Sequence, residues 1–222
     1  LRVSPLQSYY PMAHNNFTPP MKVTFISILA LTCIFTACMQ SLAGEVTSAL
    51  AVSVDKIFAI LGDPEMKGDE KKPERQSKIR VILGESFDYE EISKRALGKE
   101  WKKLNAGQRT EFVGVFRKLL ENTYMSAFEK YSTEEVKYES ERELGKGKFV
   151  VETKVASASK VIPIHYNMMN RDGNWLVYDV KIEGVGLVKN YRSQFRKVIS
   201  KKSYEALVKQ LKEKVAKDPQ EG

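Results

Sequence analysis

The sequence has few of the residues that ligate metals or link chain segments covalently. Its 222 residues include two cysteines and two histidines. Cys33, Cys38 and His14 lie near the start, so the remainder has no thiol for a disulfide or zinc site and one histidine, His165. An Asp-rich calcium loop and the Gly-x-Ser-x-Gly elbow of many hydrolases are also missing. We therefore expect no catalytic residue, metal or cofactor, which leaves a hydrolase a distant alternative.

Charged residues are absent from one long stretch near the start. The segment from Met21 to Ala43 contains Lys22, continues without a charged residue and ends in Ser41-Leu42-Ala43. A basic start, an apolar run and small residues at the end are typical of a secretory signal peptide. We expect residues 21–43 to be cleaved off after export, and residues 1–20 to be translated upstream sequence.

An alternative end of the leader is Phe35-Thr36-Ala37-Cys38, which weakly resembles a lipoprotein processing site. Cys38 would then be acylated and would hold the protein on a membrane.

The net charge of +8 falls to +6 without residues 1–43, which hold Arg2, Lys22 and no acid. Such an excess suits an anionic membrane surface, an acidic protein or nucleic acid equally well. Because the lysines are dispersed among acids, and because we expect export, we interpret most of them as solvated surface and expect no nucleic-acid partner.

Apolar spacing predicts helices that alternate with a block of strands. Asp88 with Glu91, and Asn105 with Gln108, have the spacing of helix N-terminal caps. The predicted helices span about Val46 to Leu61, Glu74 to Leu83, Asp88 to Leu97, Ala106 to Tyr131, Leu187 to Ser200 and Ser203 to Val215. The predicted strands span Glu135 to Glu143, Lys148 to Ala156, Val161 to Met169 and Trp175 to Glu183.

Tight turns at Gly145-Lys146-Gly147 and Asp172-Gly173 join consecutive strands, so the strands should form an antiparallel meander. The pattern indicates an α+β fold in which a curved antiparallel sheet of about four strands is covered by helices. We expect one domain, residues 44–216, followed by a frayed tail, residues 217–222. Trp175 to Tyr178 is apolar on both strand faces, which leaves open a solid core covered on both sides or a cavity.

Two blocks of the sequence resemble the MlaC family of periplasmic phospholipid-transport proteins, also described as the toluene-tolerance auxiliary component of an ABC transporter. The first block is Phe87-Asp88-Tyr89, Ala96-Leu97-Gly98, Trp101, Gln108, Phe112, Phe116-Arg117 and Thr123-Tyr124. The second runs from Trp175 to Val185, then Leu187-Val188 and Asn190 to Phe195. Gly186 stands where the family is expected to have a serine.

The resemblance implies a periplasmic carrier with phospholipid as its cargo, held in an apolar cavity between sheet and helices. It also implies two membrane partners that maintain outer-membrane lipid asymmetry: an outer-membrane lipoprotein complex, and an inner-membrane ABC transporter with its membrane-anchored substrate-binding subunit. We expect a monomer. Alternatives are a carrier of a hopanoid or another apolar ligand, and a ligand-free adaptor of the transporter.

For the lipid cavity that the resemblance implies, we select candidate wall residues by their residue type and by the strand or helix face on which they lie. Arg117 and Asp179 are assigned to structure, Asp179 to an ion pair or a cap. Arg192 and Lys189 are the candidates for meeting a head-group phosphate. The candidate lipid-binding residues are Phe116, Leu120, Tyr124, Val151, Val155, Ile164, Tyr166, Met168, Trp175, Val177, Tyr178, Tyr191 and Phe195.

Overall fold

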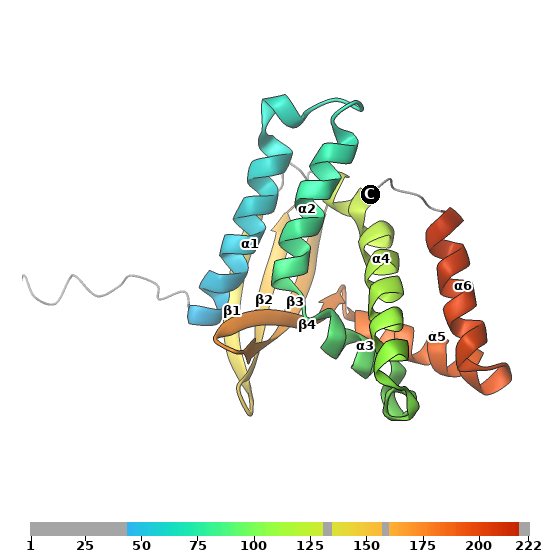
Figure 1. Ribbon diagram of the computed structural model, residues 1–222. Coiled ribbons are helices and arrows are strands. Elements are labelled where there is room, and N and C mark those ends of the chain that lie inside the picture. Colours follow the sequence, from blue (N-terminus) through green and yellow to red (C-terminus); the bar gives the residue numbers. More distant parts are fainter. Residues whose placement is uncertain (1–43, 131–134, 157–159, 218–222) are drawn as a thin grey trace, which may run out of the picture. The chain divides into compact units, whose positions relative to one another are not determined.

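The structure, a computed structural model, describes residues 44–130, 135–156 and 160–217 (Figure 1). The predicted leader with Cys38, the segment before it and residues 218–222 of the predicted tail lie outside these ranges. The described residues all belong to one compact unit. The domain boundaries expected from the sequence therefore stay predictions at both ends.

Helices and strands follow one another in the predicted order. The helices are α1 (Glu45–Gly62), α2 (Lys72–Ser86), α3 (Tyr89–Leu97), α4 (Ala106–Lys130), α5 (Leu187–Lys201) and α6 (Tyr204–Lys217), with short 3-10 helices at Pro64–Met66 and Gly98–Lys103. The strands are β1 (Glu135–Gly145), β2 (Lys148–Ala156), β3 (Val161–Arg171), β4 (Asn174–Ile182) and β5 (Val185–Gly186).

The five strands lie in the order β1-β2-β3-β4-β5, and each neighbouring pair is antiparallel. This confirms the predicted α+β class and meander. The fifth strand, β5, was not predicted, because two residues are too few to show an alternating pattern.

Local capping explains where several helices begin. The Asp88 carboxylate accepts a hydrogen bond from the Glu91 backbone N–H at 2.9 Å, as its spacing predicted. Asn105 and Gln108 form the predicted reciprocal box, with bonds of 3.0 and 2.9 Å. These caps satisfy backbone donors that have no partner within the helix.

Three apolar clusters make up the core. The first joins α3, α4, α5 and α6, the second joins α1 to the sheet, and the third joins α1, α2 and α4. Figure 1 shows α1 and α2 beside the sheet. Phe87, between α2 and α3, packs against all three clusters, and its backbone bridges Val177 of β4. The chain segment around Phe87 thus connects the helical clusters to the sheet.

Within the described residues, no helix has both the length and the apolar character needed to cross a membrane.

Candidate functional site

A cavity of about 370 Å³ lies between the sheet and the helices. It is bounded by α1 and α4, by β1 to β4 and by the segments around α3 and α5. Its wall is mainly aliphatic and aromatic. The apolar and aromatic lining residues are Val54, Ile57, Phe58, Leu61, Leu83, Phe87, Tyr89, Ile92, Leu120, Tyr124, Phe128, Val136, Val155, Ile162, Ile164, Tyr166, Val180, Ile182 and Leu187.

Four charged residues also border the cavity, and each has a partner. Lys160 and Glu183 form an ion pair at 3.4 Å, and both side chains are about half exposed. The Asp179 carboxylate accepts a hydrogen bond of 3.0 Å from the Val188 backbone N–H in the first turn of α5. Glu121 is held by two arginines. The wall therefore offers an apolar ligand little unpaired charge.

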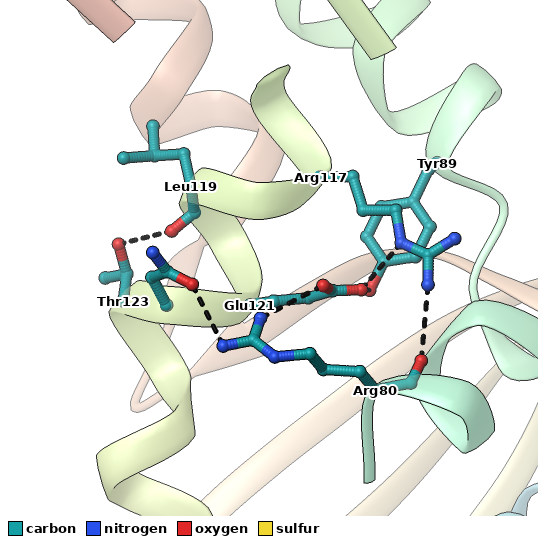
Figure 2. A network of polar contacts seen from close by, with 7 residues as sticks. Arg80, Tyr89, Arg117, Leu119, Glu121 and Thr123 are labelled. Atoms are coloured by element: carbon teal, nitrogen blue, oxygen red, sulfur yellow. Dashed lines mark hydrogen bonds and ion pairs between the residues drawn. The ribbon is translucent and has the colours of Figure 1, made fainter. Parts of the chain in front are cut away.

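Glu121 is the centre of a polar network on the α4 side of the cavity (Figure 2). Its carboxylate accepts hydrogen bonds from Arg80 of α2 at 3.2 Å and from Arg117 at 2.7 Å. The Tyr89 hydroxyl of α3 donates to the same carboxylate at 3.2 Å, and the Arg117 guanidinium lies 5.0 Å from the Tyr89 ring centre. The network therefore ties α2, α3 and α4 together at the wall, which Glu121 and Tyr89 help to line.

Burial changes the acidity of three groups at the cavity. It raises the pKa of Tyr89, with the Glu121 charge adding to the effect, so this hydroxyl stays protonated and remains a donor. Burial raises the pKa of Tyr166 to about 12. Burial also raises the pKa of Asp179, against the opposing effect of the Val188 N–H. Because its carboxylate accepts the hydrogen bond from the Val188 N–H, Asp179 acts as a cap for α5, one of the two structural roles predicted for it.

Five of the predicted lipid-binding residues lie on the cavity wall. They are Leu120, Tyr124, Val155, Ile164 and Tyr166. Two belong to α4 and three to the strands β2 and β3, so the structure does bring together side chains from both elements named for the site. Their contact with a lipid stays a prediction.

The other eight lie away from this wall, seven of them in packed parts of the molecule and Trp175 at the edge of a second cavity, beside α1 and α2. Phe116, Tyr191 and Phe195 form an aromatic group with ring centres 5.0 to 5.5 Å apart. Val151, Met168 and Val177 are buried between α1 and the sheet. Trp175 stacks edge-on against Phe149, and Tyr178 lies under Arg95 at 4.2 Å. For these eight, lipid contact also stays a prediction.

The two head-group candidates are on α5 and do not line the cavity. Lys189 and Arg192 are both exposed. Arg192 lies against Gly98, where an added Cβ would come within 3.0 Å of the guanidinium. Because Gly98 has φ of +59°, a backbone conformation suited to glycine, the close approach and the turn both favour this residue.

Four wall residues on α1 were not named as site residues from the sequence. These are Val54, Ile57, Phe58 and Leu61. Their helical spacing was visible, and it predicted a buried face. That pattern could not show that the first half of α1 would pack on the sheet while the second half borders a cavity.

His165 lies outside this site. Its ring Nδ1 is 3.8 Å from a Glu152 carboxylate oxygen, on strands β2 and β3, and it does not line the cavity. Within the ranges that the structure describes, no three His, Cys, Asp or Glu side chains are placed to hold a metal ion.

Comparison with known proteins gives concordant matches. The model of a family described as MlaC protein matches residues 52–213. The intermembrane phospholipid transport system binding protein MlaC of Haemophilus influenzae is 25% identical over 166 residues, which cover 72% of this chain and 78% of that protein. The family match includes both sequence blocks quoted above.

A solved structure shares the fold. The phospholipid-binding protein from Ralstonia solanacearum, determined in complex with a phospholipid, matches with a TM-score of 0.71 and 25% sequence identity. The match covers 78% of this chain and 98% of that one.

Proposed function

The chain belongs to the MlaC family, as its two sequence blocks predicted, and we propose that it is a phospholipid carrier. The observation that carries this proposal is the apolar cavity between sheet and helices. The relatives support phospholipid as the class of ligand, because one is named for phospholipid transport and another was solved with a phospholipid bound.

The cavity suits acyl chains physically. Each methylene group that leaves water contributes about 0.8 kcal/mol, so acyl chains supply a large driving force without a specific polar site. Glu121 and Asp179 are hydrogen-bonded, and Lys160 and Glu183 pair with each other. An entering acyl chain therefore does not cover a charged group that lacks a partner. Binding then depends on the shape and apolar character of the wall.

The Lys160–Glu183 pair suggests how the lipid is oriented. Both side chains border the cavity and are half exposed, which places this pair where the cavity meets solvent. The acyl chains would lie among Ile162, Ile164 and Val155, and the phosphate would stay outside, near Lys160. Lys189 and Arg192 remain candidates for a more distant contact with the head group.

The proposed route is the one that the family resemblance implies. The protein would work in the periplasm, as a monomer, between an outer-membrane lipoprotein complex and an inner-membrane ABC transporter with its anchored substrate-binding subunit. Its role there would be to maintain lipid asymmetry of the outer membrane. The predicted signal peptide supports this location.

The test is native mass spectrometry of the purified protein, followed by solvent extraction and identification of any bound species. A mass excess equal to one phospholipid or two would support the proposal. Delipidated protein should then take up phospholipid from vesicles, and failure of that uptake would contradict it.

Other outcomes separate the alternatives. Extraction of a hopanoid or another apolar molecule in place of phospholipid would favour a carrier with different cargo. A bare polypeptide mass, with no uptake from vesicles, would favour a ligand-free adaptor of the transporter.

A further inference from the structure

Helix α5 has an unusual distribution of charge. Its 15 residues include five basic side chains, Lys189, Arg192, Arg196, Lys197 and Lys201, and no acidic one. We call these five residues the basic face. Lys189, Arg192 and Arg196 are spaced i, i+3, i+7 and so share one stripe, with Lys197 and Lys201 beside it. All five are exposed.

The basic face is not neutralised by the protein itself. Ion pairs join the described residues at many other places, including Lys212 with Glu111 on the neighbouring helices α6 and α4. None of the five cations of the basic face has a carboxylate partner within the described ranges. The neighbouring α6 adds four lysines, Lys209, Lys212, Lys214 and Lys217, against two acids, Glu205 and Glu213. The C-terminal helices thus carry a concentrated positive field.

The N-terminal end of this basic helix lies next to the cavity. Leu187, the first residue of α5, is part of the cavity wall. Two large apolar side chains beside wall residues are exposed to solvent: Val185, 62% exposed, and Val161, 57% exposed. Val185 lies two residues before α5, whereas Val161 begins β3. A basic helix with an exposed aliphatic residue just before its start has the composition of a surface that meets lipid head groups.

The composition favours a bilayer over a protein partner. Protein interfaces are enriched in aromatic residues and depleted in lysine. The basic face has three lysines, and no aromatic residue on α5 is exposed, since Tyr191 and Phe195 are both buried. A fluid anionic surface requires only charge at short range, and each lysine or arginine near it adds to the attraction.

We propose that the basic face of α5 docks the protein directly onto an anionic phospholipid bilayer, with the cavity end of α5 close to the membrane. The biological purpose of this docking rests on the proposed carrier function, because docking would bring the lipid cavity next to a source or a destination of lipid. The attraction itself needs no bound lipid.

The experiment measures binding of the purified protein to phosphatidylcholine vesicles with and without phosphatidylglycerol. We expect binding that requires phosphatidylglycerol and that is lost at high salt. The variant Arg196→Glu, Lys197→Glu, Lys201→Glu should weaken it roughly tenfold or more, because each reversal replaces attraction with repulsion. These three residues have no assigned role in holding lipid.

A matched control carries the same change of charge on other elements. Lys56→Glu, Lys67→Glu, Lys146→Glu should retain most of the vesicle binding, because these exposed residues lie on α1, in the loop before α2 and in the β1–β2 turn. Equal loss in both variants would show dependence on net charge alone and would overturn the proposal.

Two further results would overturn it. One is equal binding to neutral and anionic vesicles. The other is no vesicle binding while poly-glutamate retains the protein through the same three residues, which would indicate an acidic protein partner.

Native mass spectrometry of the same variants keeps docking separate from lipid carriage. An α5 variant that still contains phospholipid but fails to dock supports both proposals. Vesicle docking by a protein that never contains lipid would contradict the carrier function and leave the docking intact.

Discussion

Glu121 shows how a single residue can hold the cavity wall in place. It is 5% exposed, lies on the wall, and accepts hydrogen bonds from side chains of α2, α3 and α4. A carboxylate so buried is stable only with compensating charges, which Arg80 and Arg117 provide. The reverse also holds, because Arg80 is largely buried and depends on Glu121.

Glu121→Gln should destabilise the protein by about 3 kcal/mol, because it leaves two guanidinium groups without their counter-charge. Urea unfolding measures this change. The control is Glu74→Gln, which removes an exposed carboxylate that also pairs with two cations, Lys71 and Lys78. We expect its unfolding midpoint to match the wild type, and equal losses in both variants would contradict a special role for Glu121.

Asp179 makes stability depend on pH. Burial raises its pKa above the ordinary 3.8, so the folded state binds a proton more readily than the unfolded state does. The stabilisation that results is complete below the ordinary pKa and is lost as the pH rises through the raised value. Asn at this position cannot titrate but can still accept the hydrogen bond from Val188.

We therefore expect the stability of wild type relative to Asp179→Asn to fall as the pH rises above about 4. Urea unfolding of both proteins at a series of pH values measures this. Asp179→Ala, which also cannot titrate but lacks the acceptor for the first turn of α5, should be less stable than Asp179→Asn by about 1 kcal/mol at every pH. A wild-type-minus-Asn difference that does not vary with pH would contradict the assignment.

At the scale of elements, α1 divides its apolar face between two tasks. Val46 and Leu50 of its first half are buried against the sheet. Val54, Ile57, Phe58 and Leu61 of its second half line the cavity. The change along α1 marks the point beyond which a cavity, and not a packed core, separates the helices from the sheet.

Val54→Trp should fill part of the cavity and exclude lipid. The larger ring can occupy the empty volume beside Val54 and so need not be forced into the packed core. We expect the lipid-loaded fraction in native mass spectrometry to fall by about tenfold, with the fold retained by circular dichroism. Val52→Trp, two residues earlier on α1 and 54% exposed, is the matched control and should keep its lipid. Full lipid loading of Val54→Trp would show that the ligand does not occupy this cavity.

At the scale of the whole molecule, the three apolar clusters leave the cavity between them. Phe87 packs against each cluster and also borders the cavity. Empty apolar space forfeits contacts that a close-packed core would have. A ligand in that space should therefore stabilise the entire fold.

Delipidated protein should unfold at a lower temperature than the lipid-bound form. A ligand at about 100 times its Kd contributes about 2.7 kcal/mol, which corresponds to roughly 5–10 °C for a domain of this size. Differential scanning calorimetry before and after delipidation measures the shift, and refilling with phospholipid should reverse it. Identical transitions in the two preparations would contradict lipid binding within the core.

Much of the fold could be predicted from local pattern. The Asp88 and Asn105 caps, the limits of β2 and the turn at Asp172-Gly173 depend on neighbouring residues, which the sequence displays directly. The short 3-10 helices and β5 could not be predicted, because two to six residues show no period.

The cavity wall was less predictable, as α4 illustrates. Phe116, Leu120 and Tyr124 are spaced i, i+4, i+8 and share one face of the helix. Phe116 is fully buried against Tyr191 and Phe195, whereas Leu120 and Tyr124 border the cavity. Periodicity identifies the buried face but not which element lies opposite each turn.

The sequence by itself determined the α+β order, the caps, the meander and the family, because each depends on residue identity or on spacing along the chain. Only the tertiary structure decided which apolar residues pack solidly and which border the cavity, that Glu121 joins three helices, and that the cations of α5 have no carboxylate partner among the described residues. The physical reason is that packing, pairing and empty space depend on distances between segments far apart in sequence.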